Sequence, residues 1–419
     1  MVLISFLSTL FFIGVSIYSP LLFAQEPLSL LSLQALVEEV RERNPEIRAL
    51  RNRVKAKEFK AKAEGLLDDP TFKVEIEDIP IERPLNLGDS MQTRYTLGQM
   101  LPFPGKLSLR ERIAFKEALM AEAEAREKEL EVIGMLKEVY YEYAFIVESI
   151  KITREIKDVL ENVLRNAEVR YSLGQMSQQD VIKAQMEISI LVNDILTLEA
   201  EKDVTQARLN ALLNRDTPSL LPEPEEIPRE RIDMSVEELI KRAIDKNPRL
   251  RAMAYEIEAQ EAMVSLAARN YYPDLMLGIG LIRREGRFDS WDLMASINIP
   301  LWLSKYNNQV REAKANRDVS ASRLKAEKNL KTFEVREAVI KVERAERVRR
   351  LYETGLLPQA ELYFSSTLSG YQTGKVNLLT LLDNERLIKK TKIEYLRSIV
   401  DYNKGIASLE KVMGGEIGK

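Results

Sequence analysis

The period of apolar and polar positions changes in the same order twice along the chain. Residues 32–54 and 235–257 align without a gap, and each segment holds an Asn-Pro pair, Asn44–Pro45 and Asn247–Pro248. At each pair we expect one amphipathic helix to end and the next to begin, with Asn as the N-cap and Pro in the first turn. This repetition predicts two similar structural units in a single chain.

Alternating apolar and polar side chains predict two strands in each copy. The strands fall at about residues 71–80 and 91–101 in the first copy and at about 274–283 and 290–300 in the second. In the last segment Trp291 shares one face with apolar residues, while polar residues occupy the other. About ten residues of such alternation suit a strand that crosses a bilayer, and they suit equally a strand of a soluble antiparallel sheet. Periodicity alone leaves both alternatives open.

A proline-containing segment follows each strand pair, and after it comes a very long stretch with helical periodicity. Between Lys106 and Tyr171 only Gly134 interrupts apolar positions that recur every three or four residues. About 65 residues at roughly 1.5 Å each predict a rod of roughly 100 Å with coiled-coil-like packing. The pattern turns at Gly174 and returns, so that residues 106–213 predict a helical hairpin.

The second copy predicts a matching hairpin over residues 303–412, with its turn at Gly374. Its ascending helix contains Gly355 and Pro358. Because Pro removes a helical hydrogen bond and collides with the preceding turn, we expect this helix to bend there.

The first 24 residues carry no charge and are rich in Leu, Ile and Phe. We interpret residues 1–24 as a Sec signal peptide cleaved after Ala24, because a small residue stands at the cleavage position and a polar segment follows. No Lys or Arg precedes the apolar core, which leaves open a misassigned start or an uncleaved membrane anchor. No other stretch reaches the 18 apolar residues typical of a membrane-spanning helix.

Behind this segment the sequence divides into four parts. The first repeat covers residues 25–213, and a linker with four prolines covers residues 214–231. The second repeat covers residues 232–413, and a short C-terminal tail covers residues 414–419.

Composition excludes several classes of function. The 419 residues are 45% apolar and 30% charged, which predicts a folded protein. The net charge of -3 offers no basic surface for nucleic acid. Cys and His are both absent, which removes thiol and imidazole chemistry and most zinc or copper sites. We therefore predict that the protein is not an enzyme, and we expect neither a cofactor nor a resident metal.

The strand count constrains any membrane interpretation. Four strands cannot close a barrel, and open sheet edges are not tolerated in lipid. A membrane protein of this kind therefore has to oligomerise, with two chains giving eight strands and three chains giving twelve.

Several motifs stand in an order that resembles the TolC-like outer membrane efflux proteins. They are the Leu-Pro-Phe-Pro-Gly-Lys segment ending at Lys106, the turns Tyr171–Gly174 and Tyr371–Gly374, and the two Asn-Pro pairs. Residues Ala211–Arg215 and Leu356–Ala360 look most like the heavy-metal branch of that family, associated with cobalt-zinc-cadmium and copper-silver resistance. The resemblance covers nearly the whole chain after the predicted signal peptide.

The resemblance implies a mainly α fold with a membrane β-barrel portion. In a homotrimer, the helical hairpins would form a periplasmic α-barrel and four strands per chain would build a twelve-stranded barrel in outer membrane lipid. The implied function is the outer membrane channel of a tripartite efflux system, passively exporting substrates, metal cations being candidates. Its partners would be a periplasmic adaptor (membrane fusion) protein and an inner membrane RND-type pump. From the residues alone, a soluble periplasmic coiled-coil adaptor or scaffold remains the alternative.

The resemblance also places functional residues at the periplasmic tip. Asp383 falls on the position of a carboxylate ring that constricts the pore, where three such side chains would attract cations. Thr380 stands where relatives often have a second Asp. Tyr371 and Asp180 are candidate partners of a latch between neighbouring hairpins. Asp180 has a second interpretation, since Asp near the start of a helix is favoured by the helix dipole.

The remaining candidate residues lie at the turns and at one strand. Gly174, Gln175, Gly374 and Lys375 are expected to contact the adaptor, the two glycines serving first as turn formers. Trp291 is expected at a membrane interface, where Trp is enriched.

Overall fold

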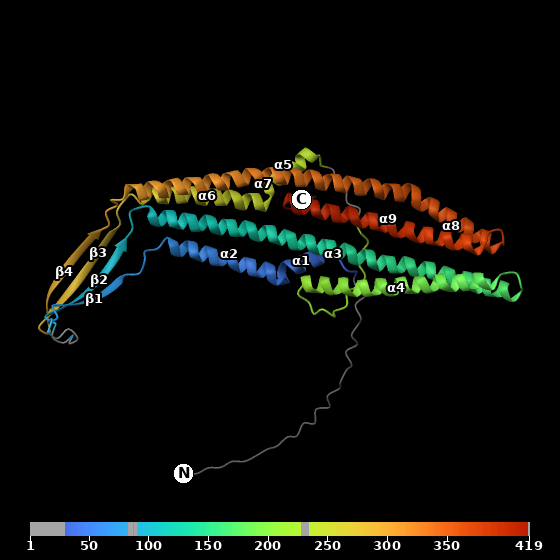
Figure 1. Ribbon diagram of the computed structural model, residues 1–419, viewed down its shortest axis with the longest axis horizontal. Coiled ribbons are helices and arrows are strands. Elements are labelled where there is room, and N and C mark those ends of the chain that lie inside the picture. The colour runs from blue at the N-terminus through green and yellow to red at the C-terminus, as the bar shows by residue number, and fades with distance from the viewer. Residues whose placement is uncertain (1–29, 83–86, 88–89, 228–233, 418–419) are drawn as a thin grey trace, which may run out of the picture.

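The computed structural model describes residues 30–82, 87, 90–227 and 234–417, and it is strongly elongated (Figure 1). A four-stranded sheet forms one end, two helical hairpins form the other, and shorter helices lie between them. The predicted signal peptide, residues 1–24, lies outside the described residues, as do residues 228–231 of the linker and 418–419 of the tail.

Both copies have the order of elements expected from the sequence. The first copy comprises α1 (Leu33–Arg43), α2 (Pro45–Glu64), β1 (Thr71–Glu77), β2 (Gln92–Leu101), α3 (Lys106–Ser172) and α4 (Gln178–Leu212). The second comprises α5 (Val236–Lys246), α6 (Pro248–Arg269), β3 (Leu275–Arg284), β4 (Arg287–Ile297), α7 (Leu303–Leu351), the π-helix η2 (Tyr352–Leu356), α8 (Leu357–Gln372) and α9 (Leu378–Met413).

The four strands form one antiparallel sheet in the order β1-β2-β3-β4. β2 of the first copy pairs with β3 of the second, from Gln92 opposite Arg284 to Leu101 opposite Leu275. The two copies thus share a continuous sheet. Within the chain, β1 and β4 stand at its two edges, so each has one side without a strand partner.

Asn44 joins two helices that are far apart in the sequence. Its side-chain Oδ1 accepts hydrogen bonds from the backbone N–H groups of Glu46 at 2.9 Å and Ile47 at 3.2 Å, which caps α2. Its Nδ2 donates to the carbonyl of Leu212, the last residue of α4, at 2.9 Å. Because helix ends leave backbone donors and acceptors unpaired, one buried amide satisfies both ends at once.

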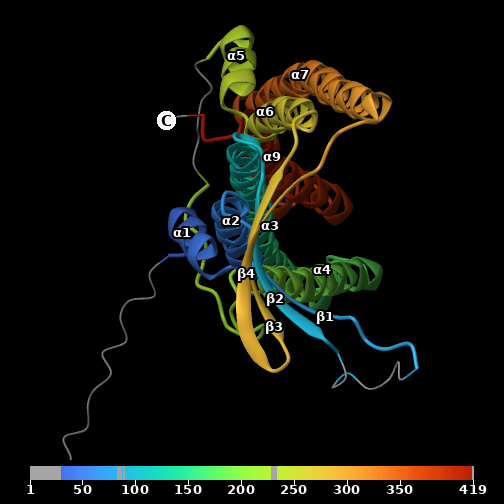
Figure 2. The ribbon, with the colours of Figure 1, turned by 90° about the vertical axis from the view of Figure 1, so that its left-hand side faces the viewer.

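Asn247 does the same in the second copy. It caps α6, and its Nδ2 donates to the carbonyl of Val412 in α9 at 2.7 Å. The chain therefore contains two composite rods, α4 followed by α2 and α9 followed by α6. These rods lie alongside α3 and α7, while α1 and α5 lie on one flank of the molecule when it is seen from the sheet end (Figure 2).

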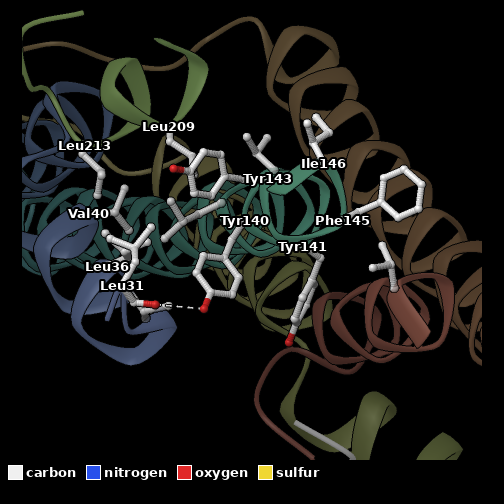
Figure 3. Packing of buried hydrophobic residues seen from close by; sticks show 14 of the residues in the cluster. Leu31, Leu36, Val40, Tyr140, Tyr141, Tyr143, Phe145, Ile146, Leu209 and Leu213 are labelled. Atoms are coloured by element: carbon white, nitrogen blue, oxygen red, sulfur yellow. Dashed lines mark hydrogen bonds between the residues drawn. The ribbon is translucent and has the colours of Figure 1, made fainter. Parts of the chain in front are cut away.

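Buried side chains from α1, α3, α4 and α9 form a core cluster near the middle of the molecule (Figure 3). Leu36, Val40 and Leu209 are at most 2% exposed. Each fully buried leucine of this kind stabilises the fold by about 2 kcal/mol. Tyr140 also donates a hydrogen bond to the carbonyl of Leu31 at 2.9 Å. These contacts fix the short helix α1 against the long rods.

The ascending helices of the two copies differ as expected. α3 runs for 67 residues without a break and passes through Gly134, where a side chain would meet only ordinary contacts. In the second copy the predicted bend coincides with η2, which contains Gly355 and is followed closely by Pro358. Figure 1 shows the change of direction between α7 and α8. In the part of the chain that the structure describes, none of the helices has a stretch of side chains hydrophobic enough to span a bilayer.

Two substitutions at Asn44 test its two roles, as the cap of α2 and as the donor to the end of α4. Asn44→Asp keeps an oxygen that caps α2 but removes the donor to Leu212, and Asn44→Ala removes both. We expect Asn44→Ala to cost about 1–2 kcal/mol, and Asn44→Asp to cost a similar amount although it keeps the cap, because its buried carboxylate would face the Leu212 carbonyl. Thermal unfolding followed by circular dichroism measures the loss, with the exposed Asn308→Ala in α7 as control. An Asp variant as stable as the parent would show that the bond to α4 contributes nothing.

Candidate functional site

One face of the sheet is apolar and exposed. The register aligns one residue from each strand in a row across the sheet, and the exposed fractions of these side chains run from 51% to 73%. The row consists of Phe72, Leu97, Ile279 and Leu293. Trp291 belongs to the next row of the same face and is 67% exposed.

The opposite face of the sheet carries charges that are paired across strands. Arg94 of β2 lies 3.3 Å from Glu77 of β1 and 3.3 Å from Asp292 of β4. The intervening strand β3 has Gly280 at this level, where an added Cβ would lie 1.9 Å from the Asp292 carboxylate. Glycine is thus required for Asp292 to reach over β3 toward Arg94.

Sequence reasoning missed Trp302, the second of the two tryptophans in the chain. Trp302 follows the end of β4 and is 78% exposed, next to the exposed Leu301 and Leu303. Trp291 is the fifth of the eleven residues of β4, near its middle, whereas Trp302 lies five residues beyond the last one, Ile297, at the end of the sheet that faces the helices. The available signal was the position of Trp302 in the Pro-containing segment that follows this strand.

The two hairpin turns at the far end of the molecule have the same construction. Gly174 and Gly374 adopt positive φ angles of 71° and 73°, and a Cβ at either would meet nothing within 4 Å. The N–H of Gln175 donates to the carbonyl of Arg170 at 2.9 Å, and that of Lys375 to the carbonyl of Gly370 at 2.8 Å. All four candidate adaptor-contact residues are exposed at this tip.

Arg170 ties the first turn to the second, a role that sequence reasoning did not assign to it. Its guanidinium donates to the carbonyls of Tyr371 at 3.1 Å and Gln372 at 2.7 Å. Its central carbon also lies 5.2 Å from the centroid of the Tyr371 ring. Tyr371 is 1% exposed, whereas the corresponding Tyr171 is 46% exposed. The contact of Arg170 with the second turn therefore buries the tyrosine of the second copy and leaves that of the first copy exposed.

Asp180 lies in the first turn of α4 and interacts with its helix start. Ser177 caps this helix by accepting from the Asp180 N–H at 3.3 Å, and the Ser177 hydroxyl donates to the Asp180 carboxylate at 2.7 Å. No hydrogen bond joins Asp180 to Tyr371 in the described part of the chain, but the two are electrostatically coupled. Burial raises the pKa of Tyr371, the Arg170 charge lowers it, and the Asp180 charge raises it.

Thr380 and Asp383 lie in the first two turns of α9. The backbone N–H of Thr380 donates to the side chain of Asn377, the N-cap of this helix, at 2.8 Å. Asp383 is exposed, while Leu381 and Leu382 beside it are buried in the cluster between the hairpins. The Asp383 carboxylate therefore faces away from the hairpin core.

Ion pairs join α9 to α4 just behind the tip. Arg386 binds the carboxylate of Glu187 with two nitrogens, and Lys389 lies 3.0 Å from Asp194. Glu187 is only 2% exposed, whereas the side chain of Arg386 is 56% exposed, so the carboxylate of this pair is shielded from water and the guanidinium is not. Sequence reasoning missed these pairs, because each charge alone resembles part of a solvated helix face.

A sheet with one apolar and one charged face, continued by long helical hairpins, defines the class of membrane ducts with a helical extension. The sequence model of the family described as "Outer membrane efflux protein" matches residues 36–215 and 239–415. The chain belongs to this family and is an efflux protein of the outer membrane. This membership decides against the alternative of a soluble periplasmic adaptor or scaffold.

Individual relatives agree with the family. The cobalt-zinc-cadmium resistance protein CzcC of Cupriavidus metallidurans is 22% identical over 360 residues, which cover 83% of this chain and 82% of that protein. The solved outer-membrane channel OprN is similar in fold, with a TM-score of 0.78, 18% identity, and coverage of 92% of this chain and 91% of its own. The outer membrane protein VceC of Vibrio cholerae gives a TM-score of 0.76 at 17% identity and covers 92% of this chain and 96% of its own.

Substituting Arg170 tests the tie at the tip. Arg170→Ala removes two hydrogen bonds from a charged donor, so we expect amide hydrogens around residues 366–376 to exchange about tenfold faster. Hydrogen exchange followed by mass spectrometry measures this. Arg165→Ala is the matched control, since the exposed Arg165 lies on the same helix and donates to Asn162 within it. Equal exchange in the Arg170 and Arg165 variants would contradict the tie.

Proposed function

We propose that three copies of this chain close into a single duct through the outer membrane and the periplasm. The observation that carries the proposal is that β1 and β4, at opposite edges of the sheet, each have one edge without a strand partner within the chain. Unpaired backbone groups are not tolerated in lipid. Joining β4 of one chain to β1 of the next is a head-to-tail contact, which closes when the rotation between chains completes a ring.

The helices support the same closure. Exposed apolar side chains form a stripe on α4 near the tip, and a second stripe follows η2 and α8 at the opposite edge of the helical layer. Such stripes are typical of helices that pack against a partner. The first consists of Ile182, Met186, Ile190 and Leu196, and the second of Leu351, Leu356, Leu362 and Tyr363.

The number of copies follows from the family resemblance, which implies twelve strands and hence three chains. In that ring the apolar row that contains Leu293 would face lipid together with Trp291, Trp302 would lie near the interface on the side of the helices, and the face that contains Arg94 would line the duct. The duplicated hairpins would give the helical part nearly sixfold symmetry. Transport through such a duct is passive, because the fold offers substrates a path without an energy source.

The proposed partners are a periplasmic adaptor and an inner membrane RND-type pump. Their contact region would be the exposed tip with Gly174, Gln175, Gly374 and Lys375. The proposed cargo is divalent metal cations, in view of the similarity to a cobalt-zinc-cadmium resistance protein. Three copies of Asp383 would constrict the tip and attract cations, and Thr380 would face the same passage one turn earlier. In the described residues, no group of three or more acidic side chains is arranged to hold a metal ion.

Placing a charge in the stripe of α4 tests the ring. We expect Ile190→Asp to prevent trimer formation, because the carboxylate would be buried between chains. Size-exclusion chromatography with light scattering in detergent measures the oligomer. Ile190→Leu, which keeps an apolar side chain of similar size at the same position, is the control and should leave the trimer intact. A trimeric Ile190→Asp protein would overturn this contact.

Removing the proposed carboxylate ring tests the pore. We expect Asp383→Ala to raise single-channel conductance and to weaken block by Co²⁺, Zn²⁺ or Cd²⁺ about tenfold, because three negative charges leave the constriction. Planar bilayer recordings measure both quantities. Asp401→Ala, an exposed residue farther along α9, is the matched control. Unchanged currents and unchanged block would remove Asp383 from the gate.

A further inference from the structure

Glu385 is a carboxylic acid enclosed between the two hairpins. It lies in the second turn of α9 and is 0% exposed. Neither of its carboxyl oxygens has a hydrogen-bond partner among the described residues. A buried ionised carboxylate without partners is very costly, so such a group is retained in the neutral form or has a role that compensates for its cost.

The charges around Glu385 cannot neutralise it. Glu187 and Asp194 face it from α4, and Arg386 and Lys389 lie beside it on α9. Each of the two cations already pairs with one of the two acids of α4. The cluster therefore holds one more carboxyl group than it has cations, and the group left over is the most deeply buried one.

A proton resolves this imbalance. Burial raises the pKa of Glu385 to about 7, with Lys389 and Arg386 lowering it and Glu187 and Asp194 raising it further. A proton on Glu385 removes the third negative charge and leaves the two ion pairs to hold α4 against α9. When the proton leaves, a buried negative charge faces two other carboxylates, which separation of the helices relieves by admitting water.

We propose that Glu385 is a proton-binding site that controls the contact between the hairpins: with the proton bound, α4 and α9 stay together, and without it they separate. The proton site itself does not depend on the proposed function. Only the role of the separated state, which is to widen the tip of the duct, rests on it. The contact begins just behind the turn where Arg170 holds Tyr371, so its separation would act directly on the tip.

The direction of the pH effect follows from the two environments of the carboxyl group. In water it would have its ordinary pKa of 4.5, whereas in the closed contact its pKa is about 7. The closed contact therefore binds the proton more tightly and is favoured in acid. Its advantage is complete below about pH 4.5, declines as the pH rises, and is lost above about pH 7. Between pH 5 and pH 8 the separated fraction relative to the closed one should rise on the order of a hundredfold.

The experiment measures the helix separation directly in the full-length trimer. The chain has no cysteine, so Lys183→Cys and Lys390→Cys introduce unique spin-label sites on exposed positions of α4 and α9. Double electron–electron resonance then gives the distance between labels from pH 5 to pH 8. In the same samples, planar bilayer recordings give the conductance.

Glu385→Gln keeps the shape of the protonated side chain and cannot ionise. We expect the parent protein to change from the short to the long distance with a midpoint between about pH 4.5 and pH 7, and Glu385→Gln to keep the short distance throughout. Glu361→Gln, an exposed acid on α8, is the control and should follow the parent. A parent distance that does not depend on pH, or an unchanged midpoint in Glu385→Gln, would overturn the proposal. A distance that follows the pH in a trimer that passes no current would support the proton site and count against the duct.

Discussion

The long rods of this protein depend on two buried asparagine amides. Each amide satisfies the start of one helix and the end of another, at Asn44 and at Asn247. Without such a partner, each junction would leave unpaired backbone groups inside the molecule. The chain therefore runs from α2 through two strands and α3 to α4, and α4 ends on the axis on which α2 began. The second copy does the same between α6 and α9. The junctions thus continue α4 into α2 and α9 into α6, and α3 runs alongside without a break from the sheet to the tip.

Much of the fold could be predicted because it depends on local patterns. Helical and strand periods, the Asn-Pro pairs, and the glycines at the two turns act over a few residues and are visible in the sequence. The bend near Pro358 was predicted correctly, although its form as a π-helix was not. Family membership confirms the outer membrane efflux interpretation. The roles of Asp383, Thr380 and the adaptor-contact residues remain predictions.

The features that could not be predicted depend on contacts between distant segments. Arg170, Arg386 and Glu385 lie on helices rich in charge, where nothing local separates a solvated side chain from one that a second helix covers. Burial and pairing of these residues arise only when the two hairpins pack together. The copies have diverged at this contact, since Arg170 of the first copy covers Tyr371 of the second and Gly370 stands in the place corresponding to Arg170. A duplicated chain has thereby acquired two unequal halves.

The π-helix η2 has a consequence for how such a chain can change over evolution. A wider turn accommodates an extra residue without breaking the rod, and each added residue rotates everything beyond it by about 100° around the helix axis. The side chains of α8 are thus set in a different angular phase from those of α7, although both belong to one rod. A single insertion or deletion in η2 would rotate the side chains of α8 around the helix axis relative to those of α7. Lineages could in this way alter which residues meet the neighbouring chain while the sheet end stays unchanged.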